Sequence, residues 1–159
     1  MKKALIILIS ALLLLAGCES APGDKRDEIL EDTSTGEIAL VILEEIEIPS
    51  AVEKSREDLP DFFRELDITG IEEVSFYICG SGAFPDELLI IKFKTNTDAT
   101  NARAAVQSRL ESRTNDFRDY APAEMYKLEN AGLQIYHNWF FFFVTEDNTR
   151  VRDIINSFL

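Results

Sequence analysis

Five consecutive aromatic residues, Trp139 to Phe143, place the strongest constraint on the fold of this chain. Successive side chains of an extended strand point to opposite faces, so these rings occupy both faces of a sheet. Either both faces are covered, which makes this a central strand, or one face is an open apolar platform for a ligand. Of these two interpretations we favour the covered strand.

Segments in which apolar and polar residues alternate predict two β-hairpins. Residues 74–79 alternate, and residues 87–94 form the return strand of the first hairpin. The second hairpin joins residues 133–136 to 139–145 through the two-residue turn His137-Asn138. Such a turn needs positive φ, which Asn tolerates well and His moderately.

Apolar residues at helical spacing predict the helices that cover this sheet. Ser34 and Glu37 form a capping-box pattern at the start of a helix over 35–46. A long helix over about 98–120 ends before Pro122. Further helical segments are predicted as a short polar helix from Ala51, a piece over 59–66, a turn or two in 123–130, and a helix over 148–158. The order α-α-β-β-α-β-β-α implies an α+β fold with an antiparallel sheet of about four strands.

The first eighteen residues are organised like an export signal. Lys2 and Lys3 precede an apolar run that is shorter than the roughly 20 residues needed to span a bilayer. The sequence Leu15-Ala16-Gly17-Cys18 resembles the lipobox of bacterial lipoproteins. The resemblance implies cleavage before Cys18 and attachment of fatty acyl groups such as palmitate to it. The alternative is a secreted protein with a chance cysteine.

Three regions follow from this interpretation. We expect a lipoprotein signal peptide over residues 1–17, a flexible tether over 18–35 and a single α+β domain over 36–159. The mature chain would then act at the extracytoplasmic face of the cell membrane, held there by the lipid on Cys18.

The composition narrows the classes of partner. Cleavage would remove Lys2 and Lys3 and no acidic residue, so the net charge of −13 would become about −15. This excess of acid argues against nucleic acid and against adsorption onto anionic lipids. After lipidation, Cys79 would be the remaining thiol, so no internal disulfide is expected. No calcium-loop or HExxH pattern occurs, and we predict neither a metal nor a cofactor.

Four short stretches carry a resemblance to a known family. They are Asp86–Lys92, Arg109–Arg113, Phe117–Pro122 and Lys127–Ala131. Together with the lipobox, they resemble the DUF4358 lipoproteins over roughly residues 37–159. The resemblance implies a small anchored domain, mostly of Gram-positive bacteria, and it implies no particular activity.

Basic residues near the first hairpin are the main candidates for binding. Lys92 and Lys94 follow Tyr77 in the predicted sheet, and Arg109 and Arg113 lie on the long helix. Gathered on one face, together with Ser75 and Arg103, they would bind an anion or an acidic partner. The alternative is pairing within the chain, with Glu87, Glu111 or Asp119 as the acids.

The other reactive residues have simpler explanations. His137, the single histidine, is predicted to serve the tight turn and not to act as a base. Cys79 is predicted to be a buried or half-buried thiol. Gly80-Ser81-Gly82 is interpreted as a hairpin loop, because no phosphate-binding motif follows it. No catalytic residues are therefore assigned.

These observations favour a binding or interaction module at the cell envelope, recognising an envelope protein or a small ligand. One alternative is an envelope enzyme that acts on a wall or peptide substrate through paired carboxylates. Another is an accessory subunit of a membrane complex. Titratable groups that converge in a deep cleft would favour the enzyme, and a flat or apolar groove would favour the module.

Overall fold

The computed structural model of the chain describes Leu30 and residues 32–159. In this part of the chain, five strands form one antiparallel sheet in the order β1-β2-β3-β5-β4. The strands are β1 (Ala51–Lys54), β2 (Ile71–Cys79), β3 (Glu87–Phe93), β4 (Gly132–Tyr136) and β5 (Trp139–Val144). The predicted α+β class and the antiparallel sheet are confirmed, and the sheet has one strand more than expected.

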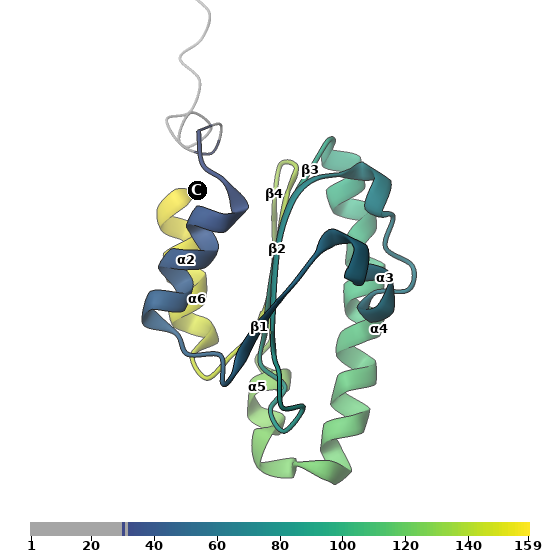
Figure 1. The fold of residues 1–159 in the computed structure, drawn as a ribbon, viewed down its shortest axis with the longest axis vertical. Helices are drawn as coiled ribbons and strands as arrows, with labels where there is room; N and C mark the ends of the chain where they lie inside the picture. Colours follow the sequence, from purple (N-terminus) through teal and green to yellow (C-terminus); the bar gives the residue numbers. More distant parts are fainter. Residues whose placement is uncertain (1–29, 31) are drawn as a thin grey trace, which may run out of the picture.

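Helices cover both faces of this sheet (Figure 1). The first layer contains α2 (Thr35–Glu45) and α6 (Asn148–Phe158). The second contains α3 (Leu59–Phe62), α4 (Asn96–Tyr120) and α5 (Met125–Glu129). Within the described residues, none of the helices has both the length and the apolar character needed to cross a membrane. The expected signal peptide lies outside these residues.

The aromatic strand β5 is buried on both sides. Trp139, Phe141 and Phe143 pack under the layer of α2 and α6, whereas Phe140 and Phe142 pack under α3, α4 and α5. The strand lies between β3 and β4, so neither of its edges is open. The covered-strand interpretation is confirmed, and the open aromatic platform was wrong.

The first strand, β1, corrects the prediction of a short polar helix from Ala51. Its four residues pair antiparallel with the end of β2, from Ala51 opposite Cys79 to Lys54 opposite Phe76. Ala, Glu and Lys favour helix locally, but the preference is weak and tertiary pairing overrides it. The exposed, charged composition suits the edge of a sheet, where it discourages pairing with other chains.

The second hairpin confirms the predicted turn. His137 has φ of 51°, in the left-handed region that a two-residue turn requires. Asn138 donates its side-chain Nδ2 to the carbonyl of Phe93 at 2.6 Å, which attaches the turn to the end of β3. On the neighbouring strand, a Cβ at Gly132 would lie 1.9 Å from the ring of Phe143. Glycine is therefore needed there for β4 to pass the aromatic strand.

The predicted helices are confirmed at three places. The helix from Thr35 has the expected capping box, with Ser34 accepting from the amide of Glu37. The long helix α4 begins at Asn96, and the last helix has the predicted bounds. The piece over 59–66 is shorter than predicted, because α3 ends at Phe62. Leu30, which belongs to the segment assigned to the tether, is buried in the apolar cluster that includes α2. Residues 18–29 and 31 of that segment lie outside the described residues.

A charge on either face of β5 tests this two-sided burial. We expect Phe142→Asp and Phe141→Asp each to destabilise the fold by roughly 3–5 kcal/mol, because neither site offers a partner for a buried carboxylate. Urea denaturation followed by circular dichroism measures the loss. Val52→Asp on the edge strand β1 is the matched control and should cost little. Wild-type stability of either phenylalanine variant would show that its face is not closed.

Candidate functional site

Two adjacent carboxylates begin the central strand β3. Asp86 and Glu87 are both only 1% exposed, although the strand that follows is apolar. The amide of Cys79 donates to the carbonyl of Asp86 at 2.9 Å, which closes the loop between β2 and β3. Asp86 reaches Lys127 of α5 and Glu87 reaches Arg109 of α4, two helices of the same layer. Buried carboxylates need partners, and each has a cation.

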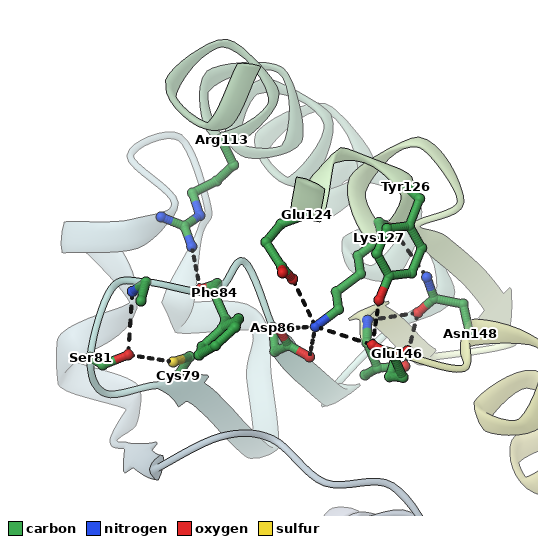
Figure 2. A network of polar contacts seen from close by, with 12 residues as sticks. Cys79, Ser81, Phe84, Asp86, Arg113, Glu124, Tyr126, Lys127, Glu146 and Asn148 are labelled. Carbon is green, nitrogen blue, oxygen red and sulfur yellow. Dashed lines mark hydrogen bonds and ion pairs between the residues drawn. The ribbon is translucent and has the colours of Figure 1, made fainter. Parts of the chain in front are cut away.

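Asp86 is paired with Lys127 of α5. The Nζ atom of Lys127 lies 3.0 Å from Oδ2 of Asp86 and 3.0 Å from Oε2 of Glu124 (Figure 2). Lys127 itself is 4% exposed. Burial, the largest single effect, lowers the pKa of Lys127, but the neighbouring carboxylates of Asp86 and Glu124 together raise it. The ammonium therefore keeps its proton and acts as a fixed charge, not as a base or nucleophile.

Further contacts from the turn between β5 and α6 hold Lys127 in place. Glu146 lies 3.5 Å from its Nζ atom and accepts a hydrogen bond from the hydroxyl of Tyr126. Asn148 donates to the carbonyl of Lys127 at 3.1 Å and accepts from the amide of Thr145 at 2.8 Å. Figure 2 shows these groups converging from α5 and from the turn between β5 and α6. The cluster thereby joins the start of β3, helix α5 and the start of α6.

Glu87 is paired with Arg109 of α4. The Nε and Nη2 atoms of Arg109 both donate to Oε2 of Glu87, the former at 2.8 Å. The guanidinium also lies 5.0 Å and 5.1 Å from the ring centroids of Phe62 and Phe63. The second oxygen of Glu87, Oε1, is buried and has no hydrogen-bond partner. Only one of the two carboxylate oxygens of Glu87 therefore accepts hydrogen bonds.

Arg113, one turn further along α4, is the least satisfied of these cations. Its Nη2 atom donates to the carbonyl of Phe84 at 3.4 Å, and its guanidinium lies 4.5 Å from the ring of Phe117. In Figure 2 a single dashed line leaves this guanidinium. The Nε atom is buried without a hydrogen-bond partner, and burial lowers the pKa of Arg113. No carboxylate of the described residues forms an ion pair with it.

Arg109 and Arg113 line a groove of about 630 Å³ between α3 and α4, which we call the α3–α4 groove. Its volume falls within the range of small-molecule sites, roughly 300–1,000 Å³. Its walls combine basic, acidic, hydroxyl and apolar side chains: Asp61, Phe62, Arg64, Glu65, Ala105, Ser108, Arg109, Ser112, Arg113 and Asp116.

A second hollow, of about 510 Å³, lies beside Lys127. Its cations already have partners, since Lys127 contacts Asp86 and Arg150 donates to Glu45 at 2.6 Å. No unpaired cation of this hollow is thus left to recognise a ligand. Among the residues that the structure describes, there is also no group of three or more His, Cys, Asp or Glu side chains that could hold a metal ion.

The structure does not bring the five predicted binding residues together. Tyr77 lies opposite Glu53 of β1, and the Nζ atom of Lys92 lies 5.3 Å from the ring of Trp139, both on the side of α2 and α6. Lys94 donates to the carbonyl of Thr69 at 2.8 Å. Arg109 and Arg113 meet on the other side, and only Arg109 pairs with Glu87, one of the acids considered for pairing within the chain.

Asp86 and Lys127 were not identified as site residues from the sequence. A signal was present, since the two residues begin the first and last of the four stretches that carry the family resemblance. Cys79 is buried as expected, with its Sγ atom 3.2 Å from Oγ of Ser81. Burial tends to raise the pKa of this thiol, but hydrogen bonds from Ser81 and the loop amides lower it.

Removing the lysine of the buried cluster tests its structural role. We expect Lys127→Met to cost roughly 3–5 kcal/mol at neutral pH, because it leaves Asp86 buried without a cation. Burial already raises the pKa of Asp86, and loss of the lysine would raise it further, so the stability deficit should shrink as the pH falls from neutral through this raised pKa towards the ordinary range of an aspartate. Urea denaturation at several pH values measures this dependence.

The matched control is Glu146→Gln, which changes the exposed partner of the same lysine. Its side chain is 71% exposed, so we expect little loss of stability. Equal losses in Glu146→Gln and Lys127→Met, or a deficit of Lys127→Met that does not vary with pH, would contradict a charge-driven role for the buried pair.

The comparisons with known proteins identify a family but no function. No curated protein and no solved structure matches the chain. The family described as "Domain of unknown function (DUF4358)" matches residues 45–145. This span contains all five strands and both buried ion pairs, Asp86–Lys127 and Glu87–Arg109. Because the match covers more than half of the sequence, the chain belongs to the DUF4358 family.

Proposed function

We propose that this chain is a lipid-anchored binding module at the extracytoplasmic face of the cell membrane, and that it receives its ligand in the α3–α4 groove. The observation that carries the proposal is Arg113. Arg113 lines the groove, its Nε atom is buried without a partner, and it has no ion pair with a described residue. A cation in this state gains more from an anionic group than one exposed to water.

The chemistry of the groove supports recognition more than catalysis. An arginine stays protonated at any physiological pH, so it positions an anion but does not transfer protons. The other buried cation of the groove, Arg109, is already held by Glu87. Lys127, outside the groove, keeps its proton for the reasons given above. These three cations therefore give no support to the paired-carboxylate enzyme.

The location rests on the sequence pattern of the first eighteen residues, which precede those that the structure describes. The lipobox Leu15 to Cys18 would direct the attachment of a diacylglyceryl group to Cys18. Its two acyl chains would give stable anchoring, which one chain alone does not. The acidic chain would be repelled by anionic headgroups, so the lipid would supply the attachment. In this arrangement the groove would face partners or ligands of the cell envelope.

Loss of the lipidated cysteine tests the location. We expect Cys18→Ala to abolish incorporation of a labelled fatty acid and to release or mislocalise the protein. Membrane fractionation with fatty-acid labelling measures both effects. Cys79→Ala is the matched control, because that thiol is buried in the fold and should not affect labelling. Unchanged membrane retention of the Cys18 variant would contradict the proposed anchor.

Crosslinking in the native bacterium tests the groove without knowledge of the ligand. A photoreactive amino acid at Ser112 would lie inside the α3–α4 groove, whereas one at exposed Gln107 would lie on the opposite side of α4. We expect covalent adducts at position 112 that decrease severalfold when Arg113→Gln is added. The same adducts at position 107, or adducts that do not depend on Arg113, would contradict the binding role.

A further inference from the structure

We propose that the α3–α4 groove recognises a zwitterionic ligand of peptide character, with its carboxylate on Arg113 and its ammonium group on the acidic side chains of the groove. This inference rests on the proposed binding function and specifies the class of ligand. It follows from the mixture of charges in the groove, from the contacts that each charge lacks, and from the charge of the whole chain.

The carboxylate end is assigned by Arg113. A guanidinium offers its donors in a planar fork that matches the two oxygens of a carboxylate. Within the described residues, the guanidinium of Arg113 makes one hydrogen bond, a long one of 3.4 Å to the carbonyl of Phe84. Its Nε donor has no acceptor. A carboxylate in the groove would offer the guanidinium a charged acceptor beyond this one long hydrogen bond.

The ammonium end is assigned by the three acids of the groove. Asp61 lies on α3, Glu65 follows that helix, and Asp116 lies three residues after Arg113 on α4. None of the three forms an ion pair with a described residue. All three side chains are exposed, so their charges carry little desolvation penalty in the folded chain. Together they favour binding of a cation nearby.

The same acids exclude a strongly anionic ligand. The groove has as many acidic as basic side chains, and one of its bases, Arg109, is already neutralised by Glu87. The whole chain also has a net charge of −13, which repels a dianion such as phosphate at long range. A carboxylate that carries its own ammonium group is neutral overall and avoids this repulsion.

The remaining lining suits a peptide backbone. Ser108 and Ser112 present hydroxyl groups that donate and accept hydrogen bonds, as a peptide bond requires. Phe62 adds a half-buried aromatic ring at the wall. The volume of about 630 Å³ accommodates a short peptide.

Titration with a defined probe tests the inference. The full chain, solubilised from membranes in detergent, is titrated calorimetrically with the dipeptide alanyl-alanine at millimolar concentration. N-acetylated alanyl-alanine, alanyl-alanine amide and inorganic phosphate are titrated in parallel. We expect the free dipeptide to bind and each blocked form to bind at least about tenfold more weakly, because each lacks one charged contact. Phosphate should not bind.

Variants assign the binding to the groove. Arg113→Gln should weaken binding of the dipeptide by about tenfold or more, and Arg113→Lys should retain part of it. Ser112→Glu adds a negative charge beside Arg113 at an exposed position, so it should weaken binding without unfolding the chain. The matched control is Arg103→Gln, an exposed arginine of α4 outside the groove.

The outcomes separate this inference from the proposed function. Failure of alanyl-alanine to bind, stronger binding of phosphate, or equal affinity of the blocked dipeptides would overturn the zwitterionic ligand. If Arg113-dependent crosslinking at Ser112 persists in that case, the binding function stands and only the class of ligand is wrong. Loss of both the crosslinks and the dipeptide binding would reject the groove as a binding site altogether.

Discussion

The fold depends on two neighbouring carboxylates that are buried at the start of the central strand. Asp86 and Glu87 would destabilise the fold strongly if left without cations, since an unpaired buried charge costs several kcal/mol. Lys127 of α5 neutralises the first and Arg109 of α4 the second. The helices that bring these cations must dock in one position along the sheet. A buried ion pair adds a geometric requirement to the apolar packing, because separating its two members leaves an uncompensated buried charge.

This arrangement also accounts for the position of the candidate site. Because Arg109 is held by Glu87, the segment of α4 that follows is kept against the loop between β2 and β3. Arg113 lies one turn further on, where it donates to the carbonyl of Phe84 and no carboxylate of the described residues comes within ion-pair distance. The α3–α4 groove thus contains a cation, Arg113, whose hydrogen-bond donors are only partly satisfied. Incomplete satisfaction of a buried polar group is uncommon in a structural role and more frequent where a ligand binds.

Local patterns predicted most of the elements, and the failures have a common cause. The last helix and the second hairpin had strong periodicity and clear turn residues, so their bounds were close to the observed ones. The strand β1 has four residues with weak helical preference, and pairing with β2 decided its conformation. For the candidate site, Arg109 and Arg113 were named from the sequence, but Tyr77, Lys92 and Lys94 lie elsewhere. The sequence did not indicate that α4 packs on the opposite face of the sheet from Tyr77 and Lys92.

The sequence by itself determined the class of fold, because helical and strand periodicities follow one another along the chain and the five consecutive aromatic residues favour a strand covered on both faces. It also determined the turns and caps, which depend on residues within three or four positions of each other. Only the tertiary structure decided which buried charges form ion pairs and that Arg113 forms none with a described residue. Asp86 and Lys127 are 41 residues apart, and Glu87 and Arg109 are 22 apart. Contacts over such separations leave no periodic trace along the chain, so they become visible only when the helices are packed on the sheet.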